Sequence, residues 1–206
     1  MGRSTANKAL LRAKIHIEPG MLARVPTAIS EHFSSPWAPA QLLVKQLAPL
    51  PVGLLRWWAS HSCGHVLIGT RASGYEPGGV VIRSKELRGV AYIRVTDLVK
   101  PDWELLVPIG RLLDHLLGCD CDEAGTWLSD GGGTTKALRE VGQRLQRLFP
   151  LGYGLSQAAQ NDPHAYFAEG FAYYCHDRRA LNVVDPVLER LLRTTLMHER
   201  FWQQSS

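Results

Sequence analysis

The feature that most constrains the fold is one apolar stretch at residues 104–118, ELLVPIGRLLDHLLG. Its large apolar side chains recur every three or four residues, and the stretch ends at Gly118. This spacing places them on one broad face of a helix, and a terminal glycine favours helix termination. The sequence therefore predicts a buried helix whose apolar face holds Leu105, Leu106, Ile109, Leu112, Leu113, Leu116 and Leu117.

The segments around this helix are predicted to be strands shortly before it and helices elsewhere. Short β-branched runs are typical of strands, and longer apolar repeats of helices. Strands are predicted at residues 64–72, 79–84 and 88–98, and helices within 38–60 (two, around Pro49 and Pro51), 134–149, 163–176 and 186–202. The GYEPGG segment at 74–79 is interpreted as a connection. The fold class is α+β, with a small mixed sheet followed by a mainly helical C-terminal half.

The length and composition indicate one folded domain with a basic beginning. A chain of 206 residues can bury a continuous core, and 45% hydrophobic with 20% charged residues is ordinary for folded proteins. The first 24 residues hold Arg3, Lys8, Arg12, Lys14 and Arg24 against a single Glu18. We therefore expect a basic N-terminal arm or leading segment over residues 1–37 and a single domain over residues 38–206.

The charge balance and the cysteines exclude several classes of protein. The net charge of +4, from 23 Lys and Arg against 19 Asp and Glu, is too modest to favour nucleic acid as a partner. No stretch has the roughly 18–20 apolar residues of a membrane span, and no apolar signal region follows the N-terminus. The four cysteines form no CxxC pair, so reduced thiols are expected. These features predict a soluble, cytoplasmic protein that does not enter a membrane.

Two stretches together resemble a known family. The first, residues 104–118, carries Gly110, Leu113, Asp114 and Gly118, and the second, residues 163–174, reads PHAYFAEGFAYY. They resemble the anthrax toxin lethal factor-like family of gluzincin metallopeptidases. That family shows roughly HExGHxxD and, later, a Glu four residues before the Glu of FAE. The resemblance covers roughly residues 45–195 and implies a zincin-like metallopeptidase fold.

The family's zinc-binding positions are all substituted in this chain. Laid on the pattern, the first His falls on Val107, the catalytic Glu on Pro108, the second His on Arg111 and the third-ligand Glu on Ala165. Valine and alanine offer no lone pair, and arginine stays cationic and repels a metal ion. We therefore expect a pseudoenzyme without zinc or other cofactor. Pro108 also predicts that the helix begins nearby, because proline is tolerated in the first turn.

Other motif residues are retained and define an expected former-site pocket. Glu169 lies four residues after Ala165, so both share one helix face and Glu169 is expected to face the former metal centre. We predict an ion pair between Arg111 and Glu169 in place of the metal. The nearest candidate for the tyrosine that assists the oxyanion in the resembled family is Tyr153, which fits an ordinary turn aromatic equally well. The pocket is expected to contain Arg111, Asp114, His115, Glu169 and Tyr153.

Other metal-ligand patterns are present but do not match a standard site. His115 and Cys119 are one helical turn apart with Cys121 close behind, a possible soft-ligand cluster. The alternation of His61, Cys63 and His65 would place the three on one face of a strand. Whether either set binds a metal stays open at the level of sequence.

Phosphate-loop and serine-nucleophile interpretations find less support. The run SDGGGTTK at residues 129–136 lacks the P-loop spacing and is interpreted as a flexible connection that ends in a threonine N-cap. Ser129 and Ser156 stand outside any GxSxG motif.

The sequence thus favours a catalytically inactive, metallopeptidase-like binding or regulatory module. Its partner would be a peptide or protein held in the former substrate cleft, with the strand RGVAYIRV at residues 88–95 as the pairing edge. One alternative is a divergent metal-dependent hydrolase with relocated ligands, drawn from Asp114, His115, His164 and Glu169. Another is a nucleic-acid binder that uses a basic N-terminal arm. The identity of the partner and the oligomeric state stay open.

Overall fold

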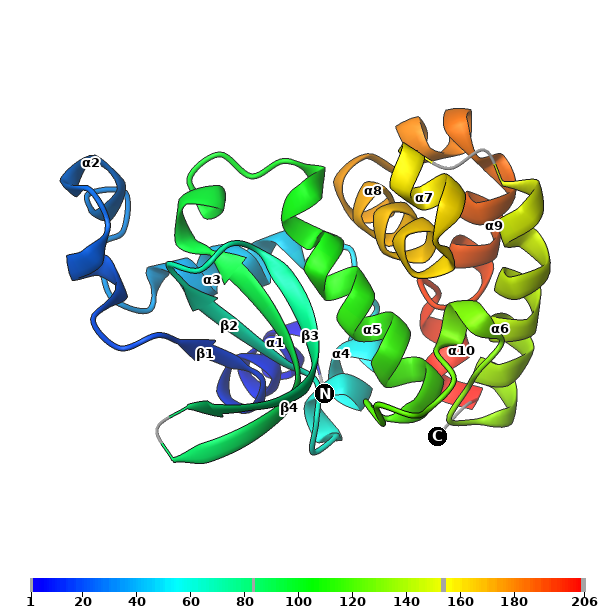
Figure 1. The fold of residues 1–206 in the computed structure, drawn as a ribbon, viewed down its shortest axis with the longest axis horizontal. Helices are drawn as coiled ribbons and strands as arrows, with labels where there is room; N and C mark the ends of the chain where they lie inside the picture. Colours follow the sequence, from blue (N-terminus) through cyan, green and yellow to red (C-terminus); the bar gives the residue numbers. More distant parts are fainter. Residues whose placement is uncertain (1, 83, 153–154, 205–206) are drawn as a thin grey trace.

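The computed structural model describes residues 2–82, 84–152 and 155–204, except the side chain of Gln204 (Figure 1). A four-stranded sheet has the order β1 (Ile15–Ile17), β2 (His65–Gly69), β4 (Lys85–Arg94) and β3 (Gly74–Ile82). β1, β2 and β4 are parallel, whereas β3 runs antiparallel to β4 at one edge. The prediction of an α+β fold with a small mixed sheet is confirmed.

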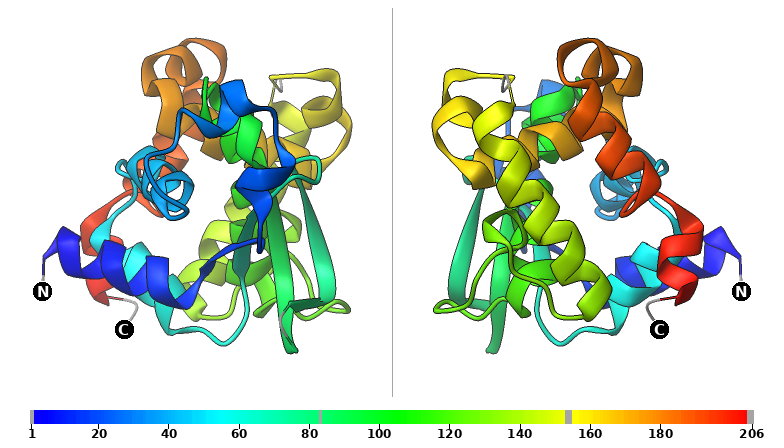
Figure 2. Two further views of the ribbon diagram at one scale, coloured as in Figure 1. Left: turned by 90° about the vertical axis from the view of Figure 1, so that its left-hand side faces the viewer. Right: turned by 90° about the vertical axis from the view of Figure 1, so that its right-hand side faces the viewer.

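Strand alternation separates a core face of the sheet from a second, smaller apolar face. Val66, Ile68 and Ile93 are fully buried in the main core, and Figure 2 shows the helices gathered on one side of the strands. Val90 and Tyr92 point the other way and join a separate small cluster. Because successive side chains of a strand alternate between faces, this register decides which residues enter the main core.

Two expectations about the strands are wrong. The GYEPGG segment is not a connection between strands, because it belongs to β3, where the register shifts between Glu76 and Gly79. A bulge of this kind accommodates Pro77, which has no N–H to donate. The run RGVAYIRV lies mostly in β4, which is hydrogen bonded to β2 and to β3. The edge strands of the sheet are β1 and β3, and β3 is the edge strand that contacts α5 (Val107–Cys119).

Of the two alternatives for the N-terminus, a basic arm or a leading segment, the structure has a leading segment that packs into the core. Helix α1 (Arg3–Ala13) buries Ala6 and Leu10 against α4 (Val52–Ser60), and β1 then enters the sheet. Lys14 is buried, and its ammonium group donates hydrogen bonds to the carbonyl oxygens of His61 and Cys63. Positive and apolar residues lie on different faces of this amphipathic helix. Counting charges therefore did not reveal that one face is buried.

Short helices connect β1 to β2. They are η1 (Met21–Arg24), α2 (Thr27–Ser30), α3 (Ala38–Gln46) and α4. The two helices predicted around Pro49 and Pro51 are confirmed as α3 and α4. This pair of helices covers the core face of the sheet and contributes Leu43, Leu54 and Trp58 to the buried core.

The C-terminal half is helical, as predicted, and begins at the motif helix. After η2 (Val95–Leu98) and η3 (Trp103–Leu106), helix α5 (Val107–Cys119) has Pro108 in its first turn, which confirms the predicted start. The predicted helix at 186–202 is two helices, α9 (Pro186–Thr194) and α10 (Glu199–Gln204). The elements after α5 are η4 (Leu128–Asp130), α6 (Lys136–Leu148), η5 (Phe149–Leu151), α7 (Gln157–Asn161), α8 (Pro163–Val184), α9 (Pro186–Thr194) and α10 (Glu199–Gln204).

The glycine-rich connection before α6 is tightly packed. Its threonine N-cap is confirmed, since the Thr135 hydroxyl accepts a hydrogen bond from the Leu138 N–H at 3.2 Å. The expected flexibility is wrong, because a Cβ on Gly132 would lie 1.9 Å from the Thr126 carbonyl oxygen. Glycine is needed here for close backbone approach rather than for mobility. In the part of the chain described, no helix has the length and apolar character needed to cross a lipid bilayer.

Helices α5 and α8 cross at Gly110. A Cβ at this position would lie 2.7 Å from both the Cα and the carbonyl oxygen of Ala168. The two backbones therefore touch without an intervening side chain, and this contact sets how the two motif helices face each other. Figure 1 shows α5 running between the sheet and the helical half, with α8 beside it.

We predict that Gly110→Ala lowers the free energy of unfolding by about 1–3 kcal/mol, the usual cost of overpacking. Helix propensity alone would make the alanine variant more stable by up to about 1 kcal/mol. A net loss of stability would therefore come from the close contact between the two helices. Urea unfolding measures the change. The matched control is Gly74→Ala, because a Cβ there meets nothing within 4 Å. Equal stability of both variants would show that the helices do not cross this closely.

Candidate functional site

A cavity of about 840 Å³ lies between the β3 edge of the sheet and the two motif helices. Its walls come from the beginning of β3, from η2 and η3, from the first turns of α5, from the N-cap of α7 and from the middle of α8. Three of the four substituted motif positions line it, together with Glu169. The residues used below are Tyr75, Asp97, Lys100, Asp102, Trp103, Glu104, Val107, Pro108, Arg111, Ser156 and Glu169.

Glu169 is the buried charged group of this cavity. Its side chain belongs to a residue that is only 6% exposed, and Oε1 accepts a hydrogen bond from the Ser156 hydroxyl at 2.7 Å. Oε2 has no hydrogen-bond partner among the described residues. Burial raises the pKa of Glu169, and this effect outweighs the hydrogen bond from Ser156 and the positive charge of Arg111. A buried carboxylate oxygen without a partner is a costly feature that needs an explanation.

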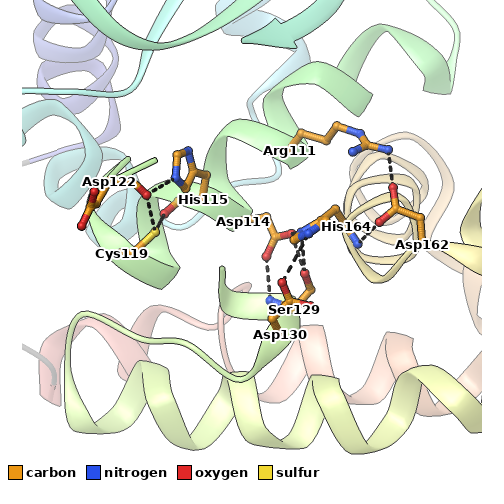
Figure 3. A network of polar contacts seen from close by, with 9 residues as sticks. All are labelled: Arg111, Asp114, His115, Cys119, Asp122, Ser129, Asp130, Asp162 and His164. Carbon is orange, nitrogen blue, oxygen red and sulfur yellow. Dashed lines mark hydrogen bonds and ion pairs between the residues drawn. The ribbon is translucent and has the colours of Figure 1, made fainter. Parts of the chain in front are cut away.

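Arg111 does not form the predicted ion pair with Glu169. Its Nη2 instead donates to Asp162 Oδ2 at 2.8 Å, and Figure 3 shows the guanidinium turned toward the beginning of α8. Asp162 is held in place because its Oδ1 caps α8 by accepting from the His164 N–H at 2.9 Å. The pKa of Asp162 is lowered, since the contacts with Arg111 and His164 outweigh burial. Arg111 and Glu169 share the cavity but not a contact.

Asp114 belongs to a second polar network outside the cavity (Figure 3). It is completely buried, and its two oxygens accept hydrogen bonds at 2.7 Å from the backbone N–H and the hydroxyl of Ser129. His164 Nδ1 lies 3.2 Å from Asp114 Oδ2, and Nε2 lies 3.3 Å from Asp130 Oδ2. The network joins α5, η4 and the first turn of α8. Asp114 was expected in the pocket, and the structure places it on another side of α5.

The meeting of Ser129, His164 and Asp114 does not have the geometry of a nucleophilic triad. Both the serine hydroxyl and the aspartate contact the same ring nitrogen of His164, Nδ1, at 3.2 Å. In a triad the histidine uses one nitrogen for each partner. Ser129 is 2% exposed and already donates to Asp114. These contacts fit a structural link between helices.

His115 also lies outside the cavity, against expectation. Its Nδ1 accepts from the Tyr75 hydroxyl at 2.7 Å, and Nε2 donates to the Asp122 carbonyl oxygen at 2.8 Å. Its ring stacks on Trp127, with centroids 4.4 Å apart. Burial lowers the pKa of His115. Both ring nitrogens are therefore occupied, and the side chain supports the wall that carries Tyr75.

Two further sequence-predicted positions complete the comparison. Ala165 is buried one turn before Glu169 on α8 and does not line the cavity. Tyr153 lies outside the described residues.

The other candidate ligand sets are dispersed. Cys121 contacts Cys63, and His61 and Cys63 precede β2, so they do not share a strand face with His65. His65 instead lies 3.1 Å from His16 Nε2 through its Nδ1. Within the ranges that the structure describes, no group of three or more His, Cys, Asp or Glu residues is arranged to hold a metal ion. The relocated ligand set of the hydrolase alternative is likewise divided between the cavity, the Asp114 network and the Tyr75 wall.

The residues at the family's zinc positions do not fit a zinc ion. Val107, Pro108 and Ala165 have no donor side-chain atom, and Arg111 brings a positive charge that is already paired with Asp162. Among the motif residues that line the cavity, only Glu169 has a side-chain oxygen that could bind a metal ion. One carboxylate cannot supply the three or four protein ligands of a zinc site.

Comparisons with protein-family models, with curated proteins and with solved structures found no match for this chain. The geometry and chemistry of the cavity are therefore the observations that bear on its function.

Most residues that line the cavity were missed by the sequence analysis, and a local signal exists for only a few of the residues at the site. Asp162 was detectable as the residue before Pro163, a typical N-cap followed by a first-turn proline. Ser156 is likewise the N-cap of α7, accepting from the Ala159 N–H at 3.2 Å. Trp103 packs against Tyr173 with centroids 4.5 Å apart. No local sequence pattern predicts that these residues lie close to one cavity, because they belong to separate elements.

We predict an elevated pKa for His164, measurable by NMR titration of its ring. Burial alone would lower this pKa, but the hydrogen bond and charge of Asp114, helped by Asp130 and Asp162, raise it above the ordinary value of 6.5. In Asp114→Asn the pKa should fall, since the hydrogen bond and the charge of Asp114 are the largest contributions that raise it. Glu140→Gln is the control, because Glu140 is exposed on α6, and it should leave the pKa of His164 unchanged.

The same pair makes stability depend on pH. A histidine whose pKa is higher in the folded state contributes stability that is complete below the unfolded pKa and is lost as pH rises through the folded pKa. The stability difference between wild type and His164→Gln should therefore shrink as pH rises from 6 to 9. A difference that grows with pH would contradict the pairing of His164 with Asp114.

Proposed function

We propose that this chain is a zincin-like pseudopeptidase of the lethal factor type, which binds a peptide segment of a protein partner in the former substrate cleft. The observation that carries the proposal is that motif residues from two separate helices line the same cavity. Val107, Pro108, Arg111 and Glu169 come from two helices about fifty residues apart, and they line one cavity. In the proposed relationship, Val107, Pro108 and Arg111 are positions of a former catalytic centre, and none of the three offers a metal ligand.

The sheet supports the same interpretation. β3 is the antiparallel edge strand, and the cavity begins at its first residues, Gly74 and Tyr75. An edge strand has a row of main-chain N–H and C=O groups that an extended peptide can pair with. The cleft therefore offers main-chain pairing on one side and side-chain pockets on the other.

The size and lining of the cavity suit a peptide. Its volume of about 840 Å³ falls in the range of roughly 300–1,000 Å³ typical of ligand sites. Trp103 supplies an aromatic wall that is backed by Tyr173, and polar groups from η3, α5 and α8 stand around it. Rigid aromatic anchors of this kind commonly dominate the energy of recognition.

Restoring the zinc motif tests the relationship to zincins. We predict that a chain with Val107→His, Pro108→Glu, Arg111→His and Ala165→Glu binds close to one zinc ion, because histidines one turn apart on α5 then face a carboxylate on α8. Wild type should retain less than about 0.1 zinc per chain, for lack of donors. Elemental analysis of the purified proteins measures both. The control keeps Arg111 with the other three changes and should bind little zinc. A folded fourfold variant without zinc would count against the shared architecture.

Peptide binding is tested with ligands selected from a random peptide display library. We expect a selected peptide to protect amides of β3 and the first turn of α5 in hydrogen exchange, since it pairs with the strand edge above the helix. Trp103→Ala should weaken binding about tenfold or more, the usual effect of losing an aromatic anchor. Trp37→Ala is the matched control, because Trp37 is 55% exposed and lines a different cavity. Protection confined to other surfaces would overturn the proposal.

A further inference from the structure

Oε2 of Glu169 has no hydrogen-bond partner in the described part of the chain, and this indicates which kind of group the cavity would bind. The residue is about nineteen-twentieths buried, being 6% exposed, and its other oxygen is occupied by Ser156. Arg111, the partner predicted for Glu169 from the sequence, is paired with Asp162 instead. A ligand that donates a hydrogen bond to Oε2 would remove the cost of leaving a buried acceptor unsatisfied.

The charges around the cavity favour a positive donor. Its lining holds the acidic residues Asp97, Asp102, Glu104 and Glu169 against Lys100 and Arg111. The charge of Arg111 is largely balanced by Asp162, which stands beside the cavity. Asp102 and Glu104 are exposed at η3, so they are available to attract a cation from solvent. The remaining field is negative, and field lines concentrate in a concave site.

We propose that the cavity recognises a basic side chain, lysine or arginine, of the bound peptide, with its cationic nitrogen on Glu169 Oε2 and its aliphatic stem along Trp103. This inference rests on the proposed peptide-binding function and specifies which peptides it selects. Charge-assisted hydrogen bonds are about twice as strong as neutral ones. The indole of Trp103 adds an apolar and cation-attracting surface for the stem.

A neutral ligand is the competing possibility. If Glu169 were protonated, Oε2 would donate to a peptide carbonyl, and binding would strengthen as pH falls. The groups that face Glu169 are Ser156, Arg111, Glu104 and Asp162, from the N-cap of α7, from α5, from η3 and from the N-cap of α8. With a cation as ligand, affinity must instead weaken as pH falls, because proton and ligand compete for the same oxygen.

The experiment compares a cation with its neutral counterpart. Benzamidine and benzamide have nearly the same shape, but only benzamidine is charged at pH 7. Titration of each into the full chain, followed by NMR shifts of α5, α8 and the Trp103 indole, should show benzamidine binding about tenfold or more tightly, as expected for a charge-assisted bond in a partly desolvated site. Glu169→Gln should abolish the difference, and Glu140→Gln should preserve it.

Glu104→Gln provides a second variant that does not alter the buried core. It should weaken benzamidine severalfold and leave benzamide unchanged, which keeps the test decisive even if Glu169→Gln fails to fold. Equal binding of the two compounds, or binding of neither, overturns the inference. If the selected peptides bind at β3 but need no basic residue, the proposed function is supported and this inference is wrong. Benzamidine binding at Glu169 in a chain that selects no peptides keeps the cation site and rejects the peptide-binding function.

Discussion

The rest of the structure depends on the backbone contact between α5 and α8. At Gly110 the two helices approach so closely that even a methyl group would meet the main chain of Ala168. This contact fixes the rotation of each helix about its axis. It turns Arg111 and Glu169 toward the cavity beside β3 and turns Asp114 toward η4 on another side. Arg111 and Asp114, three positions apart on α5, lie only about 60° apart around the helix axis, and yet they contact different elements, Asp162 and Ser129.

Two polar links hold the first turn of α8 against α5, and they differ in their expected weight. Arg111 and Asp162 are each about one-third exposed, so their pair should contribute at most about 1 kcal/mol. Asp114 is fully buried and contacts Ser129 and the partly exposed His164. Removing one partner of a buried charged group typically costs about 3–5 kcal/mol. The Asp114 network therefore determines much of the mutual position of the helices, while the Arg111 pair mainly decides which charges stay available in the cavity.

The sequence predicted those features that arise from local patterns. The start of α5 at Pro108, the Thr135 cap and the helical C-terminal half follow from rules that act within one element. The failures concern contacts between elements. Lys14 was counted as surface charge, yet its ammonium reaches two carbonyl oxygens in the connection from α4 to β2. GYEPGG looked like a turn, yet a bulge lets it pair with β4. Neither outcome can be inferred without knowing which segment lies alongside.

The failed Arg111–Glu169 pairing explains the character of the cavity. Arg111 pairs with Asp162 rather than with Glu169. Asp162 is already held at the N-terminus of α8, because its Oδ1 caps the helix. A negative charge is also stabilised at that end of a helix by the aligned peptide dipoles. Pairing there orders only the arginine, whereas pairing with Glu169 would draw the guanidinium deeper into a desolvated position. Arg111 therefore stays at the rim. As a consequence, Glu169 keeps one buried carboxylate oxygen that has no partner among the described residues, and Arg111 does not neutralise its charge directly.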